Sequence, residues 1–200
     1  GALAGYFAPA NQRVTVPAGG TVIATGVYHR EWTWQNPLPQ GKGLTATWGS
    51  GPSDIYAVGG GSILHYDGAA WEVTATTAED LGAVGGSGPA NVFAVGDYGT
   101  IMHYDGTAWT AMASGTYNTL NGVWSNASDN AFAVGDYSTI LHYDGTAWTA
   151  MASGVTNGLA GVWGSGPADV FAVGGNGTIL HYDGTAWTSM ASGVTTGLRA

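Results

Sequence analysis

A histidine and an aspartate recur two residues apart at four places in the chain, and this pair is the first feature that could do chemistry. In the last copy the two residues are His181 and Asp183. Residues two apart on a strand share a face, so each pair could form an acid–base couple or contribute metal ligands. We expect instead a structural role, in which the pair is a buried hydrogen-bonding position that locks a hairpin. The two sets are His65, His103, His142 and His181, and Asp67, Asp105, Asp144 and Asp183.

Metal binding is disfavoured by the number of ligands that each copy offers. A zinc site needs about three or four ligands at about 2 Å, and one copy supplies a single His and a single Asp. A calcium ion is coordinated by about six to eight oxygen atoms. The acidic loop residues, at Asp97, Asp136 and the Asp54/Asp169 positions, supply only one carboxylate to each loop. We therefore expect no metal and no cofactor.

Catalysis is disfavoured in the same way. The chain contains no G-x-S-x-G elbow, Walker motif, H-E-x-x-H or dinucleotide fingerprint. A glycosidase needs one unique pair of facing carboxylates, but the acidic residues here recur by repetition. We expect a protein that is not an enzyme.

Charge excludes two classes of partner. The chain carries 13 acidic residues and a net charge of −9, and its four basic residues are Arg13, Arg30, Lys42 and Arg199. Nucleic acids and anionic membranes are bound by clustered Lys and Arg, so neither is expected as a partner. No apolar run is long enough for a membrane span. Cysteine is absent, which excludes disulfides and thiolate metal sites.

The elements that position these residues are internal repeats. Similar segments begin at Leu44, Leu81, Leu120 and Leu159, with spacings of 37, 39 and 39 residues, and a further start stands at Leu198. The last complete unit reads LAGVWGSGPADVFAVGGNGTILHYDGTAWTSMASGVTTG. A period of this length indicates a solenoid or a propeller.

Each unit holds four runs with strand character, which in the last copy are residues 159–163, 170–173, 178–182 and 186–190. Asp183-Gly184 between the third and fourth runs predicts a tight primed turn. Four antiparallel strands in about forty residues form a propeller blade, whereas the coils of a parallel β-helix are shorter and lack this hairpin chemistry. The recurring core positions are Trp71, Trp109, Trp148 and Trp187, and Val58, Val95, Val134 and Val173.

The first 43 residues keep the skeleton of the unit in a degenerate form. Aligning Leu3 with Leu159 places Phe7 under Trp163, and one deletion followed by a two-residue insertion places Trp32 under Trp187. We therefore predict an all-β fold: one domain, residues 1–200, forming a five-bladed β-propeller of four-stranded antiparallel blades of about 39 residues. The predicted blades are 3–43, 44–80, 81–119, 120–158 and 159–197, and residues 198–200 start a further strand or form a closing latch.

The pattern L-x-x-V-W-G-S-G-P-x-D-V-F-A-V-G-x-x-G-T-I-L-H-Y-D-G stands almost complete at residues 159–184. It resembles a group of bacterial propeller repeats that look distantly like WD and Asp-box propellers, and it is recognisable over residues 44–197. The Asp-box match fails in detail, because Gly184 directly follows Asp183 and the box places its glycine two residues on. The resemblance implies a propeller and an exported, extracellular or cell-surface protein.

Two sets of loops are expected on one face of the ring, since strand direction alternates. The candidate ligand-binding residues in these loops are Asp97, Tyr98, Tyr117, Asn118, Asp136, Tyr137, Asn157 and Asn176. Exposed Tyr, Asn and Asp on a rigid scaffold form a recognition surface, although ordinary polar loops have the same composition. The first hypothesis is a secreted, non-catalytic, lectin-like module that binds glycans or other surface ligands multivalently through loop faces and inter-blade grooves.

The second hypothesis is a structural subunit of an extracellular filament or surface array. Three of the four basic residues, Arg13, Arg30 and Lys42, belong to the degenerate first copy, and the other copies are almost wholly acidic. Such asymmetry favours head-to-tail self-assembly through the first blade and the chain termini, with Arg199 at the other end.

Overall fold

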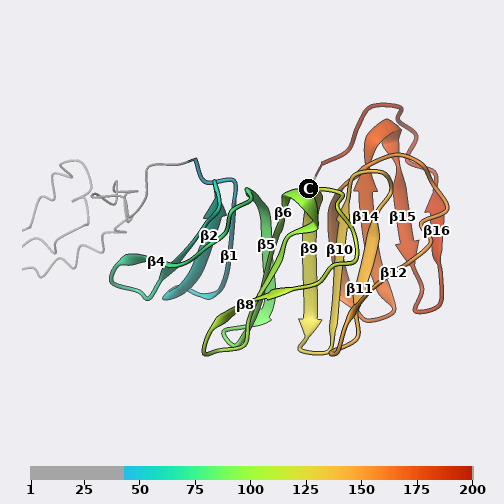
Figure 1. Ribbon diagram of the computed structural model, residues 1–200. Helices are drawn as coiled ribbons and strands as arrows, with labels where there is room; N and C mark the ends of the chain where they lie inside the picture. Colours follow the sequence, from blue (N-terminus) through green and yellow to red (C-terminus); the bar gives the residue numbers. More distant parts are fainter. Residues whose placement is uncertain (1–42, 200) are drawn as a thin grey trace, which may run out of the picture. The chain divides into compact units, whose positions relative to one another are not determined.

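The computed structural model describes residues 43–199 (Figure 1). The predicted first blade and the assembly candidates Arg13, Arg30 and Lys42 lie outside these residues. The described part is all-β apart from two three-residue 3-10 turns, η1 (Asp97–Gly99) and η2 (Gly175–Gly177). No helix in this part is long and apolar enough to cross a membrane.

Sixteen strands form four separate four-stranded antiparallel sheets, one for each of the four clear repeats. Blade I contains β1 (Ala46–Gly51), β2 (Asp54–Gly59), β3 (Ser62–Tyr66) and β4 (Trp71–Thr76). Blade II contains β5 (Leu81–Gly88), β6 (Asn91–Gly96), β7 (Ile101–Tyr104) and β8 (Trp109–Met112). Blade III contains β9 (Leu120–Ala127), β10 (Asn130–Gly135), β11 (Ile140–Tyr143) and β12 (Trp148–Ala150). Blade IV contains β13 (Leu159–Gly166), β14 (Asp169–Gly174), β15 (Ile179–Tyr182) and β16 (Trp187–Met190).

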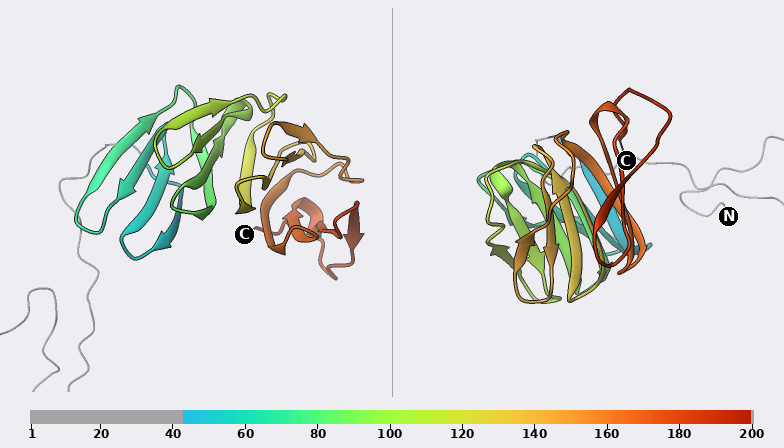
Figure 2. Two further views of the ribbon diagram at one scale, coloured as in Figure 1. Left: turned by 90° about the horizontal axis from the view of Figure 1, so that it is seen from below. Right: turned by 90° about the vertical axis from the view of Figure 1, so that its right-hand side faces the viewer.

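Within each blade the strands follow one another in chain order, and adjacent blades stand face to face (Figure 2). The first strands β1, β5, β9 and β13 contact one another in succession, so they form the inner wall of the arc, and each fourth strand lies at an outer edge. This is the blade arrangement of a β-propeller, as predicted. Four blades are described, and the predicted fifth falls in the residues outside them.

The second and third strands of each blade are joined by a two-residue turn in which both central residues have positive φ. In blade II these residues are Tyr98 (52°) and Gly99 (69°), and the Thr100 N–H donates to the Asp97 carbonyl oxygen at 3.0 Å. Positive φ at both positions defines the type I′ turn that suits the twist of a hairpin. The corresponding pairs are Gly60-Gly61, Tyr137-Ser138 and Asn176-Gly177.

The hairpin predicted at Asp183-Gly184 is present, but its turn is centred one residue later. The Asp183 N–H donates to the Ala186 carbonyl oxygen at 3.4 Å, so Gly184, with positive φ (92°), and Thr185 are the central residues. The loop closes because the Asp183 Oδ1 accepts hydrogen bonds from the backbone N–H groups of Thr185 (2.8 Å) and Ala186 (3.0 Å). A side-chain acceptor therefore does here what a backbone carbonyl does in a two-residue turn.

The hydrophobic core lies between the blades. We call the surface that a blade turns towards the next blade in sequence its leading face, and the opposite surface its trailing face. The leading-face residues Phe132, Val134 and Ile140 pack against the trailing face of blade IV, and Phe93, Val95 and Ile101 pack in the same way against blade III. The equivalent leading-face residues of blade I are Tyr56, Val58 and Ile63, which pack against blade II.

An aromatic cluster of constant geometry spans each of these interfaces. Phe93 stacks on His103 of its own blade at 4.4 Å between ring centroids, and it meets Tyr143 and Trp148 of the next blade at 5.6 Å each. Full burial of one such side chain contributes about 1.5–3 kcal/mol. The predicted core role is confirmed for the buried members of the two sets, which are Trp148, Trp187, Val58, Val95 and Val134, whereas Trp71, Trp109 and Val173 are half-buried.

Candidate recognition face

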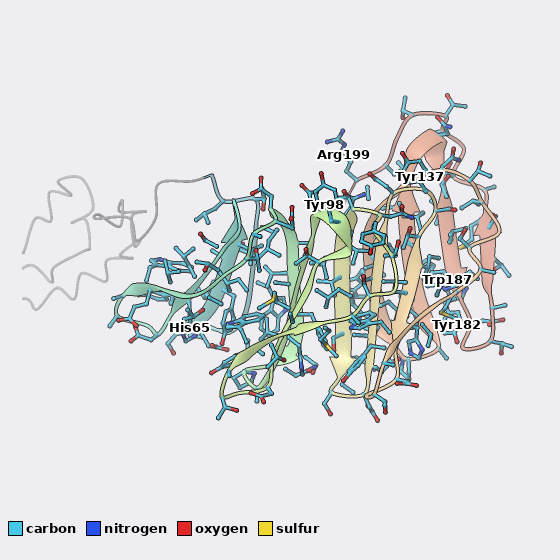
Figure 3. The ribbon with its side chains drawn as sticks, in the orientation of Figure 1. His65, Tyr98, Tyr137, Tyr182, Trp187 and Arg199 are labelled. Carbon is cyan, nitrogen blue, oxygen red and sulfur yellow. The ribbon has the colours of Figure 1, made fainter. Side chains whose placement is uncertain are left out.

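The loops that carry the sequence-predicted binding residues do gather on one face. Tyr98, Tyr137 and Arg199 lie at the same end of the blades, far from Tyr182 and Trp187 (Figure 3). Hydrogen bonds join the two sets of loops. The Asn118 amide between blades II and III donates to the Thr139 hydroxyl at 2.9 Å, beside the turn that holds Tyr137.

Three tyrosines stand out from this face. Tyr98, Tyr117 and Tyr137 have exposed fractions of 67%, 88% and 79%. No hydrogen bond links any of their hydroxyl groups to another of the described residues. A large aromatic ring left in water on a fixed loop is available to stack on a ligand.

The backbone beneath two of these rings is in a conformation that side chains rarely adopt. Tyr98 and Tyr137 sit at φ of 52° and 53°, and Ser138 follows at 58°. The left-handed conformation costs a non-glycine residue about 1 kcal/mol or more, and the equivalent turn of blade I uses two glycines. Sequence reasoning selected the tyrosines by composition but did not find this strain, because Tyr-Gly and Tyr-Ser are not recognised turn dipeptides.

The predicted asparagines are used largely within the protein. Asn157 donates to the Thr178 hydroxyl at 3.0 Å and accepts from the Asn176 amide at 3.0 Å. Asn118 and Asn157 are half-buried, whereas Asn176 is exposed. These contacts hold each fourth-to-first connection against the following turn, so they brace the face on which the tyrosines stand.

The two predicted aspartates keep free acceptor capacity. One oxygen of Asp97 accepts from the Thr119 hydroxyl at 3.2 Å, and one oxygen of Asp136 accepts from the Asn121 amide at 2.9 Å. A carboxylate has about four acceptor positions, so both can still bind a donor. Arg199, predicted as an assembly residue, is exposed and lines a shallow pocket of about 450 Å³ with Asn121, Ala160, Gly175, Gly197 and Leu198.

An inter-blade groove of about 440 Å³ lies between blades III and IV at their outer edges. Its lining is mostly small and apolar, and it includes Met151 and Trp187, with Thr185 as its one hydroxyl side chain. Polar groups that would orient a ligand are therefore sparse in it, and the tyrosine-bearing face is the better candidate site.

The recurring histidines bind a different partner from the one their spacing suggests. His181 Nε2 lies 2.8 Å from the Asp169 Oδ1, at the start of β14, and no hydrogen bond links it to Asp183 among the described residues. His65 pairs with Asp54 at 2.7 Å in the same way. In blades II and III the partner is an amide, Asn91 or Asn130.

This geometry makes the histidines structural. Burial lowers the pKa of His103 and His142, so both rings are neutral near pH 7, while Asp105 and Asp144 raise it to a smaller extent. Hydrogen bonds from Ser165 and His181 lower the pKa of Asp169. Each ring also lies against the aromatic residue of its own second strand, at 4.4–4.6 Å between ring centroids, as His103 does against Phe93.

The aspartates of the repeated pair lock the hairpin, as predicted, but they are exposed and not buried. Two backbone N–H donors hold each carboxylate, which lowers the pKa of Asp67, Asp144 and Asp183. The Thr107 hydroxyl adds a third donor at Asp105 and lowers its pKa to about 2. Residues 43–199 contain no cluster of three or more His, Cys, Asp or Glu that could hold a metal ion.

Comparison with known proteins identifies the fold alone. No family model and no curated protein matches the chain. The solved structure of YCF48 from Cyanidioschyzon merolae matches with a TM-score of 0.58 and 19% identity, over 78% of this chain and 58% of that one. YCF48 bound to D1 peptide matches with a TM-score of 0.59 and 16% identity, over 78% of this chain and 55% of that one. The chain thus spans little more than half the length of these propellers.

Proposed function

We propose that this protein is a non-catalytic binding module that recognises its ligand with the tyrosine-bearing loop face. The observation that carries the proposal is the group of three exposed tyrosines, two of them on strained left-handed backbone. Strain of this kind persists only where the surrounding structure enforces it, and it concentrates at functional positions. The interlocked loops supply the rigid support, and Asp97 and Asp136 supply free acceptors beside the rings.

Glycans are the ligand class that this face suits best. Aromatic faces stack on sugar rings, carboxylates accept hydrogen bonds from hydroxyl groups, and repeated sites convert weak affinity into avidity. The same proposal places the protein in the group of bacterial propeller repeats named above, exported and acting outside the cell.

A peptide is the second candidate ligand, and the specific support for it is the solved structure of YCF48 bound to D1 peptide. Exposed tyrosines serve peptide recognition as readily as sugar recognition, since Tyr is enriched at protein interfaces. The acidic side chains on the face would favour a peptide that carries Lys or Arg.

The test is binding of the intact protein to a glycan array and to a random-peptide array. Replacing Tyr98 and Tyr137 with alanine should lower affinity about tenfold or more for the true ligand class, because a central aromatic anchor contributes at least about 1.4 kcal/mol. Val73→Ala is the control, since Val73 is exposed in the middle of β4, an outer strand, and not in a loop of this face. Saturable binding that survives both tyrosine replacements would contradict the proposed site.

A further inference from the structure

The three exposed tyrosines of the recognition face belong to two adjacent blades. Tyr98 is in the turn between β6 and β7 of blade II, and Tyr137 is in the turn between β10 and β11 of blade III. Tyr117 is in the connection that joins these two blades. The other turns and connections between residues 43 and 199 carry no aromatic ring at the equivalent positions, which are Gly60 and Asn176 in the turns and Ala78, Thr156 and Thr195 in the connections.

Loop contacts place Tyr117 between the other two tyrosines. Its neighbour Thr116 packs against the turn of blade II, where a Cβ added to Gly99 would lie 2.2 Å from the Thr116 carbonyl oxygen. Its other neighbour, Asn118, donates to the Thr139 hydroxyl in the turn of blade III at 2.9 Å. The three rings therefore form one strip across the interface of blades II and III, which we call the tyrosine strip. Because sheets pack about 10 Å apart, a ligand that reaches all three rings must be an extended chain.

A carboxylate precedes each of the two turn tyrosines. The first position of the turn is Asp97 in blade II and Asp136 in blade III, whereas it is Gly59 in blade I and Gly175 in blade IV. Acidic and aromatic side chains thus occur together in blades II and III, and both are missing from the equivalent turns of the other two described blades. This coincidence indicates that one ligand contacts both kinds of side chain.

The charge of the strip is negative. Asp80 adds a third exposed carboxylate, because its carbonyl oxygen accepts from the Asp97 N–H at 2.9 Å. The one Lys or Arg among residues 43–199 is Arg199, and it forms no ion pair with another of these residues. An aromatic face and a neighbouring carboxylate both attract an organic cation, and the carboxylates repel an anionic ligand.

The shape of the strip favours a sugar over the side chains of a peptide. The three rings are 67–88% exposed, so they offer open faces and no enclosing walls. Peptide recognition seats alternate or periodic side chains in pockets or grooves. A pyranose ring, in contrast, lays its flat apolar face on an open aromatic ring.

We propose, on the basis of the function proposed above, that the tyrosine strip binds a polymer of amino sugars whose amino groups are free and protonated. The sugar rings stack along Tyr98, Tyr117 and Tyr137, and ammonium groups lie at Asp97 and Asp136. A neutral, N-acetylated polymer should bind more weakly, because it lacks the cation. A polymer of uronic acids should be rejected.

Bio-layer interferometry of the intact protein tests this specificity with three immobilised oligosaccharides of equal length, made of glucosamine, N-acetylglucosamine or galacturonic acid. At about pH 6 primary amines are protonated. The glucosamine oligomer should bind about tenfold more tightly than its acetylated counterpart, a ratio of about 1.4 kcal/mol that two exposed charge pairs can supply. Asp97→Asn/Asp136→Asn should remove this preference and leave binding of the acetylated oligomer unchanged, since an amide oxygen still accepts from Thr119 and Asn121.

Glu72→Gln/Asp129→Asn is the matched control. It removes the same charge from exposed positions on β4 and in the turn between β9 and β10, outside the strip, so the preference should persist. Asp97→Lys/Asp136→Lys should gain binding to the galacturonate oligomer, whereas Glu72→Lys/Asp129→Lys should not. A gain limited to the strip cannot arise from unfolding.

Four outcomes would overturn the inference: no binding to any of the three oligosaccharides, equal binding of the glucosamine and acetylated oligomers, a preference that survives Asp97→Asn/Asp136→Asn, or equally tight binding of an oligolysine peptide. The proposed function would still stand if replacement of Tyr98 and Tyr137 with alanine abolished binding to another ligand. If those replacements left all binding unchanged, the proposed function would fail as well.

Discussion

The sharpest stability prediction concerns Asn91, which fastens blade II to blade III. Its side chain is 6% exposed, and its amide donates to the Ser125 hydroxyl at 3.0 Å and to the Ala127 carbonyl oxygen at 3.2 Å, both in the next blade. Within its own blade the amide donates to Ser87 at 2.8 Å, and its Oδ1 faces His103 Nε2 at 2.9 Å. We predict that Asn91→Ala strongly destabilises the protein.

The magnitude follows from these four contacts. The exposed Ser87 hydroxyl can bond to water when Asn91 is replaced, so the loss of the Asn91–Ser87 hydrogen bond costs little. The two cross-blade bonds contribute about 1 kcal/mol each, and the half-buried His103 nitrogen left without a partner costs about 1 kcal/mol more. The free energy of unfolding should therefore fall by about 3 kcal/mol, which corresponds to a Tm lower by about 6–12 °C for a domain of this size.

Asn130→Ala is the matched control, because Asn130 holds the same place in blade III. Its bonds to Asn126 (2.6 Å) and His142 (2.8 Å) both stay within the blade. The control should lose about 1 kcal/mol, so the difference of about 2 kcal/mol isolates the cross-blade contacts. Urea unfolding followed by circular dichroism measures both values, and equal losses in the two variants would refute the assignment of the extra stability to the interface.

Three further predictions concern single positions. Tyr137→Gly should raise the free energy of unfolding by about 1 kcal/mol, because glycine adopts φ of 53° without strain, while it weakens ligand binding; urea unfolding and array binding measure the two effects. Burial lowers the pKa of His103 below its ordinary value near 6.5, against the smaller opposing effect of Asp105, so the unfolded chain binds the extra proton first as pH falls. The contribution of His103 to the free energy of unfolding should thus be complete above about pH 6.5 and should decline below it until the folded-state pKa is reached. His103→Gln should flatten this part of the curve of unfolding free energy against pH. Gly164→Ala should cost about 1–3 kcal/mol, since the new Cβ would lie 2.7 Å from the Trp124 ring, and adding Trp124→Gly should recover the part due to that clash, as a double-mutant cycle would show.

The repeat made the sheets predictable, because each copy restates the same strand and turn signals. Each of the four runs predicted between residues 159 and 190 lies on a strand of blade IV, and the first strand extends further, to Gly166. The location of the two sets of loops on one face could also be predicted, because alternating strand direction leaves no other arrangement. The five-blade count and the roles of the binding and assembly residues stay predictions.

The partner of each histidine was missed for a physical reason. A two-residue spacing suggested Asp183 for His181, but strand pairing brings Asp169, twelve residues away, to the ring. The signal was present in the repeats, since an Asp or Asn precedes each of the four repeated histidines by eleven or twelve residues. The exposure of Trp163 could not be predicted in the same way, because the residues that follow it are nearly those that follow Trp48, and only the presence of a covering blade distinguishes the two.

Blade II carries Gly85 and faces Ser125 of blade III, whereas Trp48 and Trp124 face Gly86 and Gly164 at the other two interfaces. This difference has a consequence for the order in which the blades pack during folding. Near-identical modules can dock on the wrong neighbour during folding, and such exchange is a characteristic failure of repeat proteins. A blade that carries tryptophan at the position of Gly85 would clash with Ser125. Blade II packs there without this clash, and its Asn91 adds a hydrogen bond to Ser125. The interface between blades II and III, which differs from the other two, thus favours one order of the blades.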